Sequence, residues 1–365
     1  MRPDPELASW LQLSLTPGLG TATLRNLLRK FGLPREVLAQ SRSALAPLIG
    51  TESLAAIESP RVRDAVARAL DWARAEDHFV ITLADESYPR ALLEISDPPA
   101  VLYAHGRAEL LQRPALAIVG SRNATAQGES NAEHFARALS DAGLTIVSGL
   151  ALGIDAAAHR GGLAGAASTI AVLGTGVDVV YPNRNAELAA EIARRGLLVS
   201  EFALGTPAIA HNFPRRNRLI SGLARGCLIV EAAIASGSLI TARCAADQGR
   251  DVFAIPGSIH SPLAKGCHAL IKSGAKLVES AEDVLAELAG FQATARASTL
   301  TAAPEADTGL LAVMGHDPVD VDSLCERAGL SPEEVTSQLL RLELDGRVTA
   351  LPGGLYQRLE KAHRG

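Results

Sequence analysis

Six short runs of apolar residues recur at a regular interval in the middle of the chain, and each ends in small or polar residues. They occupy positions 115–119, 144–147, 168–173, 197–200, 227–230 and 251–255. The residues that follow them lie 25 to 31 positions apart, about the length of one strand, its loop and a crossover helix. Near-continuous apolar runs indicate strands covered on both faces. The pattern predicts an α/β fold with a doubly wound, mostly parallel sheet.

The segments on either side of this region have different patterns. Residues 79–83 predict one more strand, and Pro-rich extended chain follows it. Residues 1–78 predict a domain of short helices, in which T16-P-G-L-G-T separates two helices and resembles a helix-hairpin-helix or SAM-like unit. Such a turn can offer backbone N–H groups to a phosphate, or it can serve packing alone. We therefore expect an amino-terminal helical domain at 1–78 and the sheet domain at 79–290.

The carboxy-terminal part predicts a linker and a third domain. Residues 291–307 are small and aperiodic, whereas 308–360 contain three helical stretches and a hairpin, the order of a winged helix. Ser331, Pro332 and Glu334 predict a capping box at the start of the third helix. This helix carries four carboxylates between 331 and 346 against the single Arg341. Phosphate would be repelled, so we expect a protein contact or a regulatory role rather than duplex reading.

Composition limits the classes of function. The 365-residue chain is 47% hydrophobic, has a formal net charge of -5, and carries no signal peptide or apolar run long enough for a membrane span. We therefore expect a cytoplasmic protein with no membrane partner. The four cysteines are isolated, which predicts neither a metal site nor disulfides. An acidic chain does not coat duplex DNA by bulk charge, so a nucleic-acid site would have to be a local basic patch.

The strongest such patch lies between 202 and 230, where four arginines occur without a carboxylate. Arg215, Arg216 and Arg218 crowd the start of a predicted helix that has Pro214 as its first residue, although a helix amino terminus disfavours cations. A bound anion would explain them, with Phe213 as a stacking surface for a base. The alternative is a solvated basic helix end paired with carboxylates from elsewhere.

Loops at the predicted strand ends add further anion-binding groups. Gly120, Ser121 and Arg122 follow the first strand, Ser148 and Gly149 the second, and Gly174-Thr175-Gly176 the third. Ser236, Gly237 and Ser238 precede a later helix. Because these loops converge at one sheet edge, they predict an anion or nucleic-acid groove together with the arginines. The candidate DNA-binding residues are Gly120, Ser121, Arg122, Ser148, Gly149, Phe213, Arg215, Arg216, Asn217, Arg218, Ser236, Gly237 and Ser238.

Signals for catalysis are weak. Asp155 and His159 lie four residues apart on one predicted helix, which suits an acid–base pair, but no nucleophile motif accompanies them and a structural hydrogen bond is the favoured interpretation. The chain lacks a P-loop, and G174-T-G-V-D-V lacks the third glycine of a dinucleotide fingerprint. We expect no catalytic residue and no cofactor.

The motifs in order resemble the DNA processing protein A family, also called Smf. They are G120-S-R, S148-G-L-A-L-G-I-D-A-A-A-H, A171-V-L-G-T-G-V-D-V-V-Y-P, F213-P-R-R-N-R-L-I-S-G-L, S236-G-S-L-I-T-A and F253-A-I-P-G. The resemblance implies an extended Rossmann-like domain that forms a homodimer through about 252–277, binds single-stranded DNA and loads a RecA-type recombinase during natural transformation. It implies no catalysis, and it places Arg122, Phe213 and the three clustered arginines along the strand.

Two other functions are alternatives to this one. Phosphoribohydrolases have a related sheet, but their P-G-G-x-G-T-x-x-E loop carries a catalytic glutamate, and the corresponding A235-S-G-S-L-I-T-A-R has none. A duplex-reading regulator would use the winged helix, which its acidic third helix disfavours. Released base from nucleoside monophosphates would identify the enzyme.

Overall fold

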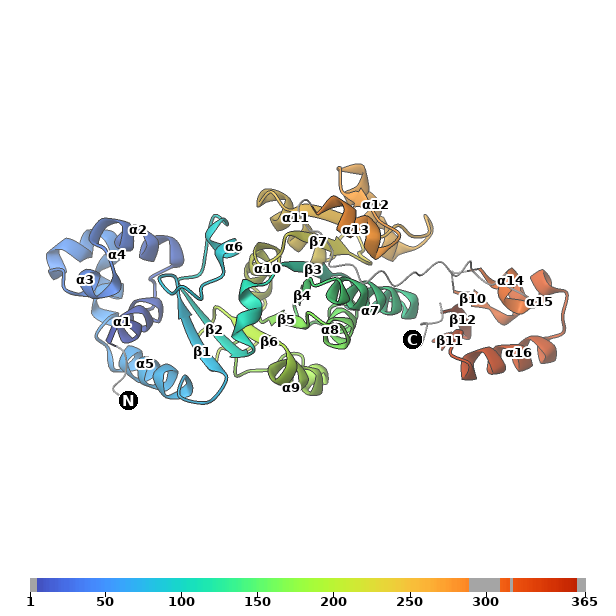
Figure 1. Cartoon of the computed structure of the whole chain (residues 1–365), viewed down its shortest axis with the longest axis horizontal. Helices are drawn as coiled ribbons and strands as arrows, with labels where there is room; N and C mark the ends of the chain where they lie inside the picture. The colour runs from blue at the N-terminus through green and yellow to red at the C-terminus, as the bar shows by residue number, and fades with distance from the viewer. Residues whose placement is uncertain (1–4, 289–308, 316–317, 360–365) are drawn as a thin grey trace.

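A nine-stranded sheet forms the centre of the protein in the computed structural model, which describes residues 5–288, 309–315 and 318–359. Its strand order is β1-β2-β6-β5-β4-β3-β7-β8-β9, and Figure 1 shows helices on both of its faces. The strands are β1 His78–Thr82, β2 Val101–Gly106, β3 Ala115–Val119, β4 Thr145–Ser148, β5 Thr169–Val172, β6 Leu197–Ser200, β7 Gly226–Ile229, β8 Asp251–Ala254 and β9 Lys276–Leu277.

Strands β3 to β9 are parallel, and β1 and β2 add an antiparallel edge. All six predicted strands of the central region are present, so the α/β, doubly wound, mostly parallel fold is confirmed. The chain first builds outward from β3 through β4 and β5 to β6, then returns to place β7 on the other side of β3. This reversal makes a topological switch point between β3 and β7, where open α/β sheets bind ligands beyond the strand ends.

Side chains of β3 alternate between two hydrophobic cores, as expected for a strand covered on both faces. Ala115 and Ala117 pack in one core, whereas Leu116 and Ile118 pack in the other. The helices of the sheet domain are α6 Arg90–Leu93, α7 Ala126–Asp141, α8 Ile154–Ala164, α9 Ala186–Arg195, α10 Asn212–Gly222, α11 Ser238–Asp247, α12 Lys265–Lys272 and α13 Ala281–Glu287, with 3-10 turns at Ala108–Gln112, Asn183–Asn185 and Pro262–Ala264. The first core lies beneath α10, α11 and α12, and the second beneath α7, α8 and α13.

The amino-terminal helices pack beside the β1–β2 edge of the sheet (Figure 1). They are α1 Pro5–Ser14, α2 Thr21–Phe31, α3 Pro34–Leu38, α4 Arg42–Ala56 and α5 Pro60–Trp72. Polar contacts fix α2 to the chain before β2, because Thr21 donates a hydrogen bond to Asp97 (2.7 Å) and Arg25 forms an ion pair with the same carboxylate (3.1 Å). The turn between α1 and α2 therefore lies close to the carboxyl end of the sheet.

The carboxy-terminal domain is a winged helix, as predicted. It consists of α14 Leu310–Met314, β10 Val319–Asp320, α15 Val321–Ala328, α16 Pro332–Leu344, β11 Val348–Leu351 and β12 Leu355–Arg358. Ser331 and Glu334 form the predicted capping box. The short strand β10, which pairs with β12, was not predicted. The predicted linker lies outside the described residues, and within the described ranges no helix is both long and apolar enough to cross a membrane.

Candidate nucleic-acid interface

Helix α10 carries the arginine cluster, and it begins earlier than the sequence predicted. Its first residue is Asn212 and its amino-terminal cap is His211, so Pro214 is the third helical residue rather than the first. From Arg216 to Gly222, every residue except Arg218 is buried. One face of the helix thus lies against the sheet, and the arginines that follow one another in sequence point into different environments.

Arg216 is a buried structural residue, which corrects its assignment as a surface phosphate ligand. It is 4% exposed. Its Nη1 donates hydrogen bonds to the carbonyl oxygens of Gly149 (2.8 Å) and Val172, and its Nε donates to Oδ1 of Asn217 (3.2 Å). Burial lowers the pKa of Arg216 to about 10, and the guanidinium stays charged at neutral pH. Arg216 therefore ties α10 to the ends of β4 and β5.

Two glycines are required where α10 meets the strand ends. A Cβ atom on Gly149 would lie 2.7 Å from the Arg216 guanidinium, and one on Gly174 would lie 2.7 Å from the Phe213 ring. Both distances are shorter than real Cβ contacts allow, so only glycine admits these side chains. The glycine motifs at these two loops serve close packing, and Gly149, being buried, is corrected from a DNA ligand to a packing residue.

Ser148, Asp155 and His159 hold the loop after β4. The Ser148 hydroxyl is fully buried and donates to the Ile118 carbonyl (2.7 Å), so its assignment to the DNA surface is also corrected. Asp155 accepts hydrogen bonds from the N–H groups of Gly149 (3.1 Å) and Ala151 (3.4 Å). Burial raises the pKa of the Asp155 carboxyl, while Arg216 and these N–H groups oppose the rise.

His159 is neutral and its tautomer follows from its neighbours. Thr169 donates its hydroxyl proton to the Ile146 carbonyl, so it can only accept from Nδ1 of His159 (2.7 Å), and Nε2 accepts from the N–H of Leu150 (3.2 Å). Burial lowers the pKa of His159 to about 3. The structural interpretation of Asp155 and His159 is supported, since both satisfy backbone N–H groups of one buried loop.

The shifted pKa of His159 predicts a pH dependence of stability. The folded-state value lies below the usual value of 6.5, so the unfolded chain takes up the proton first, and stability is lost as the pH falls from 6.5 toward 3. Chemical denaturation should show that this group lowers the free energy of unfolding by about 1.4 kcal/mol between pH 7.5 and 5.5. His159→Gln keeps a donor and an acceptor but does not titrate; identical pH profiles for the two proteins would contradict the assignment.

Arg215 and Arg218 have carboxylate partners, as the alternative interpretation anticipated. Both donate to Oε2 of Glu201, at 3.1 Å and 2.6 Å, and Arg218 also pairs with Asp97 at 3.4 Å. Asp97 in turn binds Arg25, so one ion-pair network joins α10 to the amino-terminal domain. The network holds three guanidiniums against two carboxylates. Arg218 is 14% exposed and structural, whereas Arg215 is 47% exposed and is the outermost cation.

The exposed part of the predicted site is a small surface around Phe213. The Arg122 guanidinium lies 5.9 Å from the centre of the Phe213 ring, and the Tyr181 ring lies 5.5 Å from it on another side. Arg122 has no carboxylate partner within the described part of the chain. We call Arg122, Tyr181, Phe213 and Arg215 the Phe213 surface. Arg215 belongs to it through its place on α10, two residues after Phe213, and its guanidinium lies 5.5 Å from the centre of the Phe202 ring.

The remaining predicted site residues form hydrogen bonds within their own loops or with a neighbouring loop. Asn217 donates to the Gly237 carbonyl (3.4 Å), and Ser236 and Ser238 share a hydrogen bond between their hydroxyls (2.7 Å). Gly237 is exposed, and the Ser121 hydroxyl accepts from the Asn123 N–H (3.1 Å). The structure thus brings all the predicted loops together at the switch point, but presents few of their side chains to solvent.

Sequence reasoning missed two residues of this region. Tyr181 is 48% exposed and immediately precedes the proline that ends the V-V-Y-P motif, where an aromatic residue beside proline was the available signal. Glu201 directly follows β6, and its side chain is 2% exposed. A carboxylate at the end of an apolar strand was a detectable signal for Glu201, although its arginine partners could not be read from the sequence.

Comparisons with known proteins agree with this architecture. The family model for DNA recombination-mediator protein A matches residues 79–289, and the model for the DprA winged helix domain matches residues 292–354. Protein Smf of Escherichia coli strain K12 is 44% identical over 313 residues, which is 82% of each chain.

Two solved structures are similar in fold and sequence. DNA processing protein A of Streptococcus pneumoniae superposes with a TM-score of 0.67 at 40% identity, covering 76% of this chain and 96% of that one. DNA processing protein A of Helicobacter pylori, described for its single-stranded DNA binding mode, has a TM-score of 0.51 at 32% identity and covers 56% of this chain and 93% of that one. The chain belongs to the DNA recombination-mediator protein A family.

Proposed function

We propose that this protein binds single-stranded DNA on the Phe213 surface and acts as a recombination mediator without catalysing a reaction. The observation that carries the proposal is the contact of the exposed Arg122 with the Phe213 ring, which Tyr181 borders, together with the exposed Arg215 two residues further along α10. The relative from Helicobacter pylori, whose structure is described by its single-stranded DNA binding, supports the same assignment.

The chemistry of this surface suits an unpaired strand. Guanidiniums neutralise phosphates, and aromatic rings stack on bases that a duplex would keep paired. The exposed Gly237 accepts a hydrogen bond from Asn217 of α10, and its loop could offer a backbone N–H group to a further phosphate oxygen. None of these groups selects one base over another, so binding by this surface is independent of sequence. Arg216, Ser148 and Gly149 contribute by holding the loops in place.

The proposal predicts a preference for single strands. Unlabelled single-stranded and duplex oligonucleotides of equal length should compete for a labelled single strand in a gel-shift assay, with the single strand effective at a concentration at least about tenfold lower. Phe213→Ala should reduce this preference because it removes the stacking ring. Equal competition by the duplex would exclude a surface that depends on unpaired bases.

The mediator role extends this binding to a protein partner. We infer that the protein covers incoming single-stranded DNA in the cytoplasm and helps a RecA-type recombinase to load on it, as in natural transformation. The support is the family assignment, whose description names recombination mediation. A candidate contact for a protein partner is the winged helix, because its acidic α16 exposes Leu340 (57%) and Leu344 (80%) on the same helical face.

A homodimer is the second part of this proposal. The late edge of the sheet, within residues 252–277, exposes Ile259 (67%) and Leu277 (49%), and β9 leaves one edge unpaired within the described sheet. Ile259 lies in the turn after β8 and Leu277 on the edge strand β9 itself, and an exposed apolar residue on an edge strand favours pairing with a second copy. Light scattering at micromolar concentration should give twice the chain mass, and Leu277→Arg should shift it to the monomer. A monomeric wild-type protein would contradict this interface.

A further inference from the structure

The ion-pair network runs without a break from the amino-terminal domain to the Phe213 surface. It begins at Arg25 of α2, whose Nη2 lies 3.1 Å from Oδ1 of Asp97. Asp97 in turn pairs with Arg218 at 3.4 Å. Arg218 pairs with Glu201 at 2.6 Å, and Glu201 pairs with Arg215 at 3.1 Å. Positive and negative groups therefore alternate along the network, and only its last member, Arg215, belongs to the proposed DNA-binding surface.

Neighbouring ion pairs of this network share the same atoms. Nη2 of Arg218 contacts both Glu201 and Asp97. Oε2 of Glu201 accepts hydrogen bonds from both Arg218 and Arg215. Because an ion pair weakens as its two charges separate, an atom that is drawn toward one partner interacts less strongly with the other. Each ion pair therefore competes with the next one along the network.

Burial protects this competition from screening by water. The side chains of Glu201 and Arg218 are 2% and 14% exposed, whereas that of Arg215 is 47% exposed. Buried charges are screened much less than exposed ones. A change of charge at Asp97 is therefore felt at Arg215 through two largely buried side chains, and Arg215 is the member that a phosphate can approach.

We propose that the amino-terminal domain regulates single-stranded DNA binding by setting how firmly Glu201 holds Arg215. Arg25 offsets the charge of Asp97, so Arg218 stays with Glu201. Glu201 then holds Arg215 less firmly, and the Arg215 guanidinium is available to a phosphate. Arg25 and Asp97 are thus positioning residues that act without touching DNA. This inference rests on the proposed function, because Arg215 is the residue on which the network acts.

Two neutralising variants should have opposite effects if the charges act in this order. Arg25→Ala allows Asp97 to draw Arg218 away from Glu201. Glu201 then holds Arg215 more firmly, and single-stranded DNA should bind about three- to fivefold more weakly. Asp97→Asn still accepts a hydrogen bond from the α2 threonine hydroxyl but releases Arg218 to Glu201, so DNA should bind about threefold more tightly. Anisotropy titrations of a labelled oligo(dT) at fixed salt would measure both affinities.

Matched controls separate this effect from a change in net charge. Arg29→Ala changes an exposed arginine one turn further along α2, and Asp71→Asn changes an exposed carboxylate that pairs within α5. Each control alters the net charge by the same amount as its test variant, so long-range attraction changes equally. Each test variant should differ from its own control by the factors above. Arg25→Lys keeps the charge opposite Asp97 and should bind like the wild type.

The salt dependence separates positioning from direct contact. Arg25→Ala removes no phosphate contact, so the slope of log affinity against log salt should stay that of the wild type, whereas a lost contact would make it shallower by about 0.7. In an Arg215→Ala background, neither Arg25→Ala nor Asp97→Asn should change the affinity beyond its control, because the residue on which they act is gone.

The outcomes distinguish this inference from the proposed function. Weaker binding by both Arg25→Ala and Asp97→Asn would mean that these residues only hold the two domains together, and it overturns the inference. A shallower slope for Arg25→Ala, or effects that persist without Arg215, overturn it as well. Binding by the wild type with no difference between test variants and controls overturns the inference alone and leaves the proposed function standing. A wild-type protein that binds no single strand overturns both.

Discussion

Arg216→Ala is expected to lower the free energy of unfolding by about 3–5 kcal/mol, the largest effect of any arginine in α10. The substitution removes a buried charge that donates to the carbonyl oxygens of Gly149 and Val172 and to Asn217. Those acceptors stay buried without a partner, and Asp155 loses a positive charge that stabilises its ionised form. Denaturant unfolding followed by circular dichroism would measure the loss.

Arg215→Ala is the matched control, because it removes the same side-chain atoms from the preceding residue of the same helix. Arg215 is 47% exposed, and Glu201 keeps its second partner Arg218 when Arg215 is removed. Its effect on stability should stay below about 1 kcal/mol. If both variants unfold at the same denaturant concentration, the buried role of Arg216 is wrong.

The fold could be predicted from the sequence because its signals are local and repeated. Each central strand is a short apolar run between small residues, and β3 and β6 have the predicted bounds. Helix starts were harder to place. The first turn of α10 precedes its proline by two residues, and a cap made by His211 without a side-chain hydrogen bond leaves no sequence signal.

The site was predicted as a set of loops but not as a set of exposed side chains. Residues one position apart on a helix point about 100° apart, so Arg215 and Arg216 cannot share one environment, yet the sequence does not say which of them faces the sheet. The ion partners are distant in the chain, since Glu201 and Asp97 precede Arg218 by 17 and 121 positions. Pairing between such residues is decided by the packing of whole domains.

Arg122→Ala combined with Arg215→Ala should weaken single-stranded DNA binding by on the order of 100-fold at about 0.1 M salt, because two hydrogen bonds to charged phosphates are lost. The slope of log affinity against log salt should become shallower by about 1.4, or 0.7 for each phosphate contact. Anisotropy titrations of a labelled oligonucleotide at several salt concentrations would measure both quantities. The fold should be retained, since both side chains lie at the surface.

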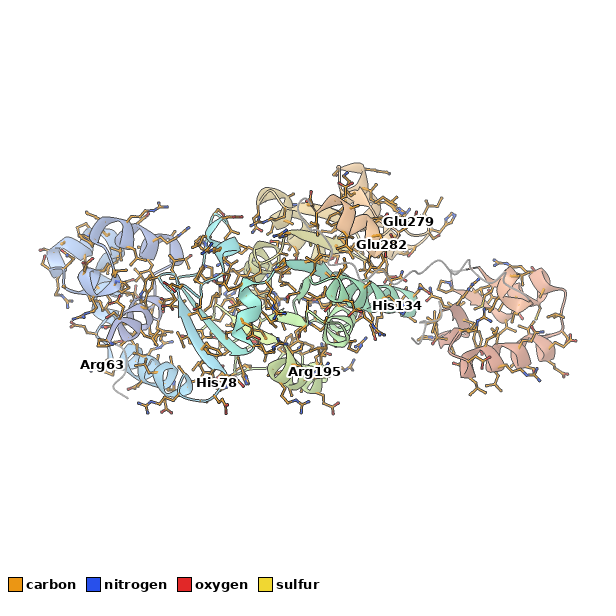
Figure 2. The ribbon with its side chains drawn as sticks, in the orientation of Figure 1. Arg63, His78, His134, Arg195, Glu279 and Glu282 are labelled. Carbon is orange, nitrogen blue, oxygen red and sulfur yellow. The ribbon has the colours of Figure 1, made fainter. Side chains whose placement is uncertain are left out.

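Arg194→Ala combined with Arg195→Ala provides the control for net charge. These exposed arginines end α9 just before β6 begins, and Figure 2 labels Arg195. They lie at the amino ends of the parallel strands, whereas the Phe213 surface lies at the carboxyl ends. Their removal lowers the positive charge by the same amount, so long-range attraction falls equally in both variants. If the control loses as much affinity and slope as the double variant at Arg122 and Arg215, binding depends on overall charge and the Phe213 surface is not the site. A loss confined to Arg122 and Arg215 locates the phosphates at the switch point of the sheet.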